Sequence, residues 1–286
     1  MILDLKSPMT TPSVLEPDND SLDPEKIARR RRMAQTILLP LIALIFLGIL
    51  WEAFCSRPGV TLPGPVKTVT ESWDYIAHPF FDHGSNDVGL GWQLASSLQR
   101  VGLGYAMAAV IGIAIGILLG KSAMAYKAFD PIFQVLRTIP PLAWLPLSLA
   151  TFNKSDPSAV FVIFITAIWP IIINTSVGVM RIPQDYENVA KVYRISGSRY
   201  FFRILLPAAS PYIFTGLRIS IGMAWLAIVA AEMLTGGVGI GFFIWDSWNS
   251  SKLPDIIVSV VYVGLVGLLL DRAIALLARF FGTRLD

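Results

Sequence analysis

Several long stretches of the chain contain no charged residue, and this feature limits the fold more than any other. Residues 33–51, 101–120 and 157–180 are uncharged and mostly apolar. A helix needs about 20 such residues to cross the hydrocarbon core of a bilayer. Of all 286 residues, 54% are hydrophobic and only 15% are charged, whereas soluble proteins have about 25% charged residues. We therefore expect an all-α integral membrane protein, which excludes a soluble enzyme and a disulfide-stapled secreted domain.

The apolar segments predict six transmembrane helices in one domain over residues 33–280, after a flexible polar tail, residues 1–32. A signal peptide is the alternative for the first helix, but that run ends in Leu50-Trp51-Glu52 rather than in small residues. The third helix contains three prolines, so we expect it to be kinked and to lie inside the bundle. The predicted spans are about 33–54, 94–120, 131–152, 157–180, 213–235 and 256–278.

Basic residues are distributed unevenly between the two sides of this topology. The tail, the loop 121–130, the segment 181–212 and the C-terminal end hold 15 of the 23 lysines and arginines. The loops on the other side hold four. Because basic loops stay in the cytoplasm, we expect both termini to be cytoplasmic. The same distribution explains the net charge of +3 without nucleic-acid binding.

Small residues occupy every fourth position of the second span. The ridge consists of Gly104, Ala108, Gly112, Gly116 and Gly120. Such a ridge exposes backbone and lets another helix approach closely. We expect it to be a helix–helix contact.

Four arginines fall within predicted spans, where an unpaired charge costs a few kcal/mol and is a candidate for function. Arg100 and Glu232 both fall near the outer ends of their spans, and we expect them to form an ion pair. The alternative is that each side chain snorkels to the interface. Snorkelling is the favoured interpretation for Arg137 and Arg218, near the cytoplasmic ends.

The segment 181–212 reads RIPQDYENVAKVYRISGSRYFFRILLPAASPY. Its apolar spacing predicts short amphipathic helices along the membrane, with a solvated loop as the alternative. Ile204, Leu206 and Pro207 match the end of the cytoplasmic signature of ABC importer permeases, which is E-A-A, three residues, G, nine residues and I-x-L-P. Of the signature's first triplet only Ala190 matches, and Arg194 stands at the position of the glycine.

Other segments extend this match. Residues 97–101, 137–147, 206–218 and 222–233 read SLQRV, RTIPPLAWLPL, LPAASPYIFTGLR and GMAWLAIVAAEM. Together they closely resemble the nitrate/bicarbonate/sulfonate/taurine branch of ABC importer permeases. NVAK at 188–191 and GGVGIG at 236–241 are most similar to the cyanobacterial nitrate and bicarbonate permeases. The resemblance covers about residues 35–280.

This resemblance implies a type I ABC importer permease in the plasma membrane of a bacterium, and more narrowly of a cyanobacterium. Such a permease would carry a small inorganic anion into the cytoplasm by alternating access. The favoured substrate is nitrate or nitrite, and bicarbonate, sulfonate and taurine are the alternatives. The implied partners are a second copy of the chain, two cytoplasmic ATPase subunits that bind ATP and Mg²⁺, and an outer substrate-binding lipoprotein. The chain itself would be no enzyme and would bind neither cofactor nor metal.

The resemblance also assigns roles to residues. Segment 185–203 would be a coupling helix, with aromatic side chains in a groove of the ATPase and arginines at its rim. The assigned coupling residues are Glu187, Asn188, Ala190, Tyr193, Arg194, Gly197, Arg199, Leu206 and Pro207. An anion pathway needs hydrogen-bond donors and positive potential, for which the candidates are Arg100, Arg137, Thr138, Trp144, Asn174, Trp225 and Glu232.

Two other classes of polytopic membrane protein agree less well with the sequence. A polytopic enzyme would need acidic or histidine clusters, but both histidines, His78 and His83, fall in one outer loop. A gradient-driven carrier often has an internal repeat with matched broken helices, and the two halves show no such match. GILLGKS at 116–122 has three residues between its glycines, where a phosphate-binding loop has four.

Overall fold

The computed structural model describes residues 24–84 and 87–281. Apart from one isolated bridge between Asp82 and Val88, the regular structure of these residues is helical. The chain divides into two compact units, residues 1–65 and 66–286. The longer helices are α1 (Pro24–Cys55), α4 (Leu90–Gly120), α5 (Ala123–Leu136), α7 (Ser155–Met180), α10 (Leu206–Thr235), α11 (Ile240–Asn249) and α12 (Leu253–Phe280).

The first unit contains the helix α1. Its apolar part, Ala34–Cys55, agrees with the first predicted span. The predicted tail is wrong for residues 24–32, which are helical. Pro24 suits the first turn of a helix, and no glycine or further proline follows before Pro40. Residues 1–23 of the predicted tail lie outside the described residues.

Within the described residues, five helices are long and apolar enough to cross a membrane, and there are six candidate spans if one bent pair of helices is counted as a broken span. The bent pair corresponds to the third predicted span. It consists of α5 and of Pro141–Phe152, which comprises η2 (Pro141–Trp144) and α6 (Leu145–Phe152), and it bends by 92°.

The sequence predicted a span over 131–152 that is kinked at its prolines; the structure breaks the pair just before Pro141, and corrects the start of the span to Ala123. Pro141 and Pro146 lie in the first turns of η2 and α6, where a missing N–H costs little. Most of the predicted loop 121–130 belongs to α5, whose first turn is capped by the Ser122 hydroxyl.

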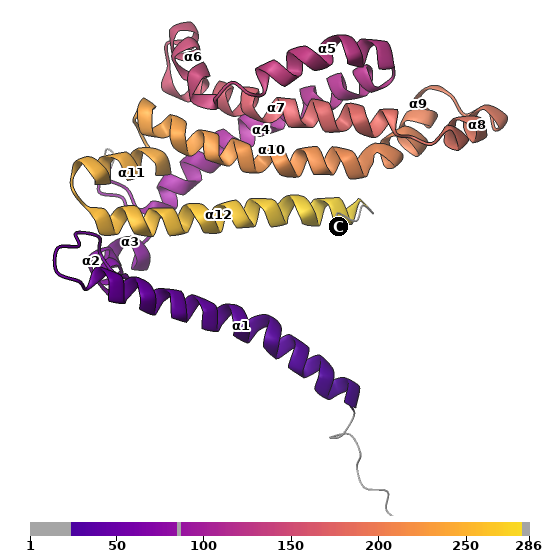
Figure 1. Cartoon of the computed structure of the whole chain (residues 1–286). Helices are drawn as coiled ribbons and strands as arrows, with labels where there is room; N and C mark the ends of the chain where they lie inside the picture. The colour runs from indigo at the N-terminus through magenta and orange to yellow at the C-terminus, as the bar shows by residue number, and fades with distance from the viewer. Residues whose placement is uncertain (1–23, 85–86, 282–286) are drawn as a thin grey trace, which may run out of the picture. The chain divides into compact units, whose positions relative to one another are not determined.

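The second unit is built around α7, which packs against α4 and α10 along much of its length. Figure 1 shows α7, α10 and α12 side by side, with α5 and α6 over α7. The predicted ridge of small residues on α4 is buried against α7. A Cβ at Gly116 would lie 2.6 Å from the Cβ of Thr175, and one at Gly120 would lie 2.6 Å from the Cβ of Val179. The helices therefore approach as closely as glycine allows.

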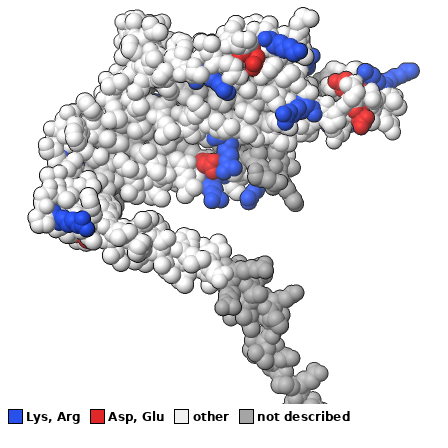
Figure 2. All heavy atoms as spheres, viewed as in Figure 1, with Lys and Arg blue, Asp and Glu red and all other residues white. Residues whose placement is uncertain are grey.

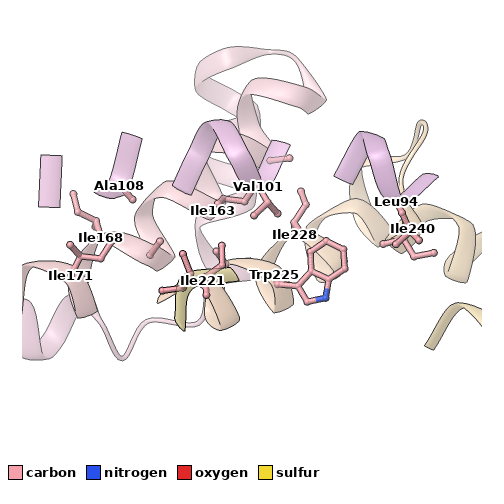
Figure 3. Close-up of a cluster of buried hydrophobic side chains, with 14 of the residues drawn as sticks. Leu94, Val101, Ala108, Ile163, Ile168, Ile171, Ile221, Trp225, Ile228 and Ile240 are labelled. Carbon is pink, nitrogen blue, oxygen red and sulfur yellow. The ribbon is translucent and has the colours of Figure 1, made fainter. Parts of the chain in front are cut away.

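The apolar core lies where α4, α7, α10 and α11 meet (Figure 3). Five of its isoleucines are fully buried. The Trp225 indole N–H donates to the backbone oxygen of Val263 on α12, at 3.0 Å. The labelled side chains are Leu94, Val101, Ala108, Ile163, Ile168, Ile171, Ile221, Trp225, Ile228 and Ile240.

Two short helices, α2 (Pro65–Glu71) and α3 (Trp73–Ala77), occur in the predicted outer loop. The buried Ser72 hydroxyl donates to Asp255 Oδ1 at the start of α12, at 2.6 Å. The Tyr75 ring packs edge-on against Phe243 of α11, with ring centroids 4.9 Å apart. Burial and nearby carboxylates, Asp255 first among them, raise the pKa of Tyr75 to about 12, so the phenol stays neutral. These contacts fix the loop to α11 and α12.

The α4–α7 contact predicts how two glycines of one helix differ. We expect Gly116→Ala to reduce the free energy of unfolding by about 1–3 kcal/mol, because the new methyl overlaps Thr175 and backbone. Gly102→Ala is the matched control, since no atom lies within 4 Å of its added Cβ. Denaturation of both variants in detergent measures the difference. Equal stabilities would contradict the proposed contact.

Candidate functional site

Four polar side chains form a stripe near the start of α4. They are Gln93, Ser96, Ser97 and Arg100, at the spacing that places residues on one face of a helix. All four contact the loop between α10 and α11 or the last turns of α10. We call these residues, together with Glu232, the Arg100 network.

The centre of the Arg100 network is the carboxylate of Glu232, on the last turns of α10. Arg100 Nη1 lies 2.7 Å from Glu232 Oε1, so the ion pair predicted from the sequence is confirmed. Glu232 Oε2 accepts hydrogen bonds from the Ser97 hydroxyl at 2.7 Å and from the Gly241 N–H at 3.1 Å. Glu232 is only 1% exposed. Three donors from two other helices thus compensate the buried charge.

The same network holds the glycine-rich loop in place. The Gly239 N–H donates to Gln93 Oε1 at 2.6 Å, and the Ile240 N–H donates to Ser97 Oγ at 3.0 Å. Gly236 and Gly237 have φ values of +76° and +94°, which favour glycine. A Cβ at Gly239 would overlap the Glu232 carboxylate. Gly236 and Gly237 are therefore favoured by their backbone conformation, and Gly239 by the close approach of the loop to a buried charge.

Arg100 also contacts a second carboxylate. Its Nε and Nη2 atoms lie 2.8 and 2.7 Å from the Oδ1 atom of Asp156, at the start of α7. The Asp156 side chain is 72% exposed. Both residues line an open cavity of about 600 Å³ together with Lys154, Thr235 and residues 236–238. One guanidinium therefore joins a buried carboxylate to an exposed one at the wall of a cavity.

A second, much smaller cavity lies at the bend between α5 and η2. Its volume is about 30 Å³, and Arg137, Trp144, Thr166 and Trp169 are among its lining residues. The cavity brings together two of the residues predicted for the pathway, Arg137 and Trp144. It lies against α7 and places one arginine beside two indole rings.

The other predicted pathway residues use their donors locally. The Thr138 hydroxyl donates to the Val135 carbonyl oxygen at 2.7 Å, and the Asn174 side-chain amide donates to the Pro170 carbonyl oxygen at 2.8 Å. The buried Trp225 donates to α12, as described above. None of these three residues lines either of the two cavities described for Arg100 and Arg137.

Sequence reasoning missed the ion pair between α10 and α12. Arg218 Nε and Nη2 lie 2.6 and 2.8 Å from the two carboxylate oxygens of Asp271, which joins α10 to α12. Arg218 is therefore paired rather than only snorkelling. The pair has no local sequence signal, because its partners are 53 residues apart. Gln93, Ser97 and Asp156 were missed for the same reason.

At the other end of α7 and α10 lie the two short helices α8 (Gln184–Val192) and α9 (Gly197–Tyr200) and the π-helical turn Phe201–Leu205. Figure 1 shows α8 and α9 beyond the ends of α7 and α10. In Figure 2 most lysines and arginines on the visible face of this unit lie in the half that carries α8. We call residues 184–205 the α8–α9 end.

The α8–α9 end exposes apolar side chains beside charged ones. Val192, Tyr193 and Phe202 are 65–78% exposed, whereas Ala190 is buried. A cavity of about 460 Å³ is lined by Glu187, Ala190, Lys191, Arg194, Ile195, Ser196 and Tyr200. This combination of apolar surface, charge and a hollow is typical of an interface with another protein.

Arg194, at the position of the signature glycine, has a φ of +51°. The chain thus keeps the left-handed backbone that a glycine would favour, at a cost of about 1–2 kcal/mol. Arginine in place of glycine at position 194 therefore changes the side chain and leaves the backbone conformation of the turn after α8 intact.

The Arg100 network predicts unequal effects for its two carboxylates. We expect Glu232→Ala to reduce the free energy of unfolding by about 3–5 kcal/mol, because it removes the centre of a buried network. Asp156→Ala, at the exposed carboxylate of the same arginine, is expected to cost at most about 1 kcal/mol. Denaturation in detergent measures both values. A larger loss for Asp156→Ala would refute this ranking.

Comparisons with known proteins identify the family. Residues 108–286 match the model of the binding-protein-dependent transport system inner membrane component. The chain is 60% identical over 241 residues to the nitrate import permease protein NrtB of Synechocystis sp., covering 84% of this chain and 88% of that protein. It is 51% identical over 260 residues to the bicarbonate transport system permease protein CmpB of Synechococcus elongatus, covering 90% and 94%.

Among solved structures, a chain of the MetNI methionine ABC transporter in an inward-facing conformation has the same fold. The TM-score is 0.59 at 16% identity, over 67% of this chain and 95% of that one. The predicted resemblance and the predicted all-α permease fold are therefore confirmed. The chain belongs to the family of binding-protein-dependent transport system inner membrane components, the permease subunits of ABC transporters.

Proposed function

We propose that the chain is the permease subunit of an ABC importer that carries nitrate into the cell by alternating access. The observation that supports nitrate is the 60% identity to a nitrate import permease over most of both chains. Bicarbonate is the second candidate, because a bicarbonate permease is 51% identical over 260 residues. Both ions are small oxyanions, so the same kind of pathway serves either substrate.

The distribution of charge supports an orientation. The α8–α9 end faces the cytoplasm in this proposal, because residues 181–212 hold five lysines and arginines. The Arg100 network then faces outward, at the other end of α10. This orientation places both termini in the cytoplasm.

The α8–α9 end is the proposed docking surface for a cytoplasmic ATPase subunit. The exposed rings of Tyr193 and Phe202 would fill an apolar groove, while Arg194 and Arg199 pair at its rim. Six further residues complete this surface or position its helices: Glu187, Asn188, Ala190, Gly197, Leu206 and Pro207. ATP and Mg²⁺ bind to the ATPase subunits.

The proposed assembly contains two copies of this chain, two ATPase subunits and an outer substrate-binding lipoprotein. Closure of the ATPase pair moves the α8–α9 end, which continues through the π-helical turn Phe201–Leu205 into α10. Interruptions of this kind recur at functional sites in helices. The motion would alternate access between the two ends of the pathway.

The proposed pathway uses positive potential rather than a closed cage of donors, because the anion must be released. Arg100 lies near the outer end of α4, and Arg137 lies at the bend of the third span, beside Trp144. The two arginines thus provide guanidinium donors at two successive depths. Trp225 remains a core residue in this scheme.

The docking proposal predicts that one substitution of the exposed Tyr193 disrupts the interface and that another leaves it intact. Tyr193→Asp is expected to abolish stimulated ATP hydrolysis and reduce uptake more than tenfold, because it places a charge in an apolar contact. Tyr193→Phe keeps the ring and is the matched control. Copurification of the ATPase with each variant, and the ATPase activity of the complex, measure the effect. Normal assembly and transport by Tyr193→Asp would contradict the proposed interface.

The substrate is tested by uptake in cells that lack this gene. We expect the chain, expressed together with its transport partners, to restore uptake of ¹³N-labelled nitrate and not of ¹⁴C-labelled bicarbonate. An empty vector and a variant of the ATPase that cannot hydrolyse ATP are the controls. Restored bicarbonate uptake without nitrate uptake would replace the first candidate by the second.

A further inference from the structure

Arg100 holds its two carboxylates in different ways. The pair with Glu232 is buried and is supported by Ser97 and Gly241. The pair with Asp156 lies at the surface, where an ion pair contributes little to stability. Asp156 Oδ1 alone receives both the Nε–H and the Nη2–H groups of Arg100. This edge of the guanidinium therefore lacks the arrangement of two parallel bonds to two oxygens that is strongest for arginine.

The edge held by Asp156 is at the wall of the cavity of about 600 Å³. Lys154, on the same wall, forms no ion pair within the described residues. The cavity thus offers the Nε–H and Nη2–H groups of Arg100 as a bidentate donor, and their present partner, Asp156, is exposed. The ammonium group of Lys154 adds a further positive charge. A planar oxyanion that is free to orient can give each N–H of Arg100 its own oxygen.

We propose that this cavity is an anion-binding site in which a planar, singly charged oxyanion replaces Asp156 on the Nε and Nη2 atoms of Arg100. Lys154 contributes positive potential, and Glu232 is a positioning residue that fixes the guanidinium. The Asp156 carboxylate competes with the anion for Arg100: it binds the guanidinium when the anion is absent and binds it again when the anion leaves. This inference rests on the proposed function, because it assigns the first stop of the transported anion at the Arg100 end.

The chemistry selects a class of ligand rather than one ion. Nitrate and bicarbonate are both planar and carry two oxygens at the spacing of a carboxylate, so both match the edge of the guanidinium. Chloride is spherical and cannot form two parallel hydrogen bonds with separate acceptors. Chloride at equal ionic strength is therefore the reference salt for the measurement.

The test is a nitrate titration of the full-length chain, assembled with its ATPase subunits in lipid nanodiscs. The midpoint of thermal unfolding of the chain is followed as nitrate replaces chloride. We expect Asp156→Asn to reduce the nitrate concentration needed for half of the shift about two- to fivefold, because the variant lacks the competing ion pair. Lys154→Gln should increase it. Lys252→Gln, on a loop outside the cavity, is the matched control and should leave it unchanged.

Arg100→Gln alone leaves Glu232 buried without its cation and risks misfolding. The double variant Arg100→Gln with Glu232→Gln removes both charges together and is expected to fold and to lose the nitrate shift. An unchanged nitrate response in Asp156→Asn, or a full response in the folded double variant, would overturn the proposal.

Failure of this site and failure of the proposed function have different outcomes. If cells with the wild-type chain take up nitrate but the purified chain shows no Asp156-dependent shift, the anion site is wrong and the transport function stands. If the cells take up bicarbonate only, nitrate is the wrong substrate. A bicarbonate titration that shows the same two- to fivefold effect of Asp156→Asn would then support the site.

Discussion

The close contact between α4 and α7 is the constraint on which the rest of the second unit depends. The spacing of Gly104, Gly112, Gly116 and Gly120 leaves no room for a single added carbon against α7. Because α4 is a continuous helix of 31 residues, this contact also fixes the orientation of its first turns. Those turns carry the Arg100 network, so the packing of apolar helices determines where the buried charge lies.

The Arg100 network shows how a membrane protein keeps a carboxylate away from water. The Glu232 charge is balanced by a guanidinium, a hydroxyl and a backbone N–H, all supplied by neighbouring elements. Glycine is needed at position 239, just before α11, and at position 241, in its first turn, because a side chain there would overlap Glu232 or the backbone of α10. Electrostatics and steric fit thus specify one loop conformation at the end of α10.

Periodic and strongly apolar features could be predicted from the sequence. The uncharged runs gave the spans, the four-residue spacing gave the α4 contact, and the opposite charges at equal depth gave the Arg100–Glu232 pair. Contacts between distant residues could not be predicted, such as Arg218–Asp271 and Arg100–Asp156, because they depend on which helices become neighbours. The prolines indicated the break before Pro141, but a proline does not tell whether it bends one helix or begins the next, so the separate helices α5 and α6 were not predicted.

The continuity of α10 has a mechanical consequence. This helix begins directly after the π-helical turn of the α8–α9 end and contains Glu232 in its last turns. Its 30 residues span about 45 Å as one helix, in which the internal proline, Pro211, lies near the start. A stiff rod of that length transmits an axial shift or a rotation almost unchanged from one end to the other. In the proposed mechanism, a movement of the α8–α9 end would therefore reach the carboxylate that fixes Arg100 through one helix.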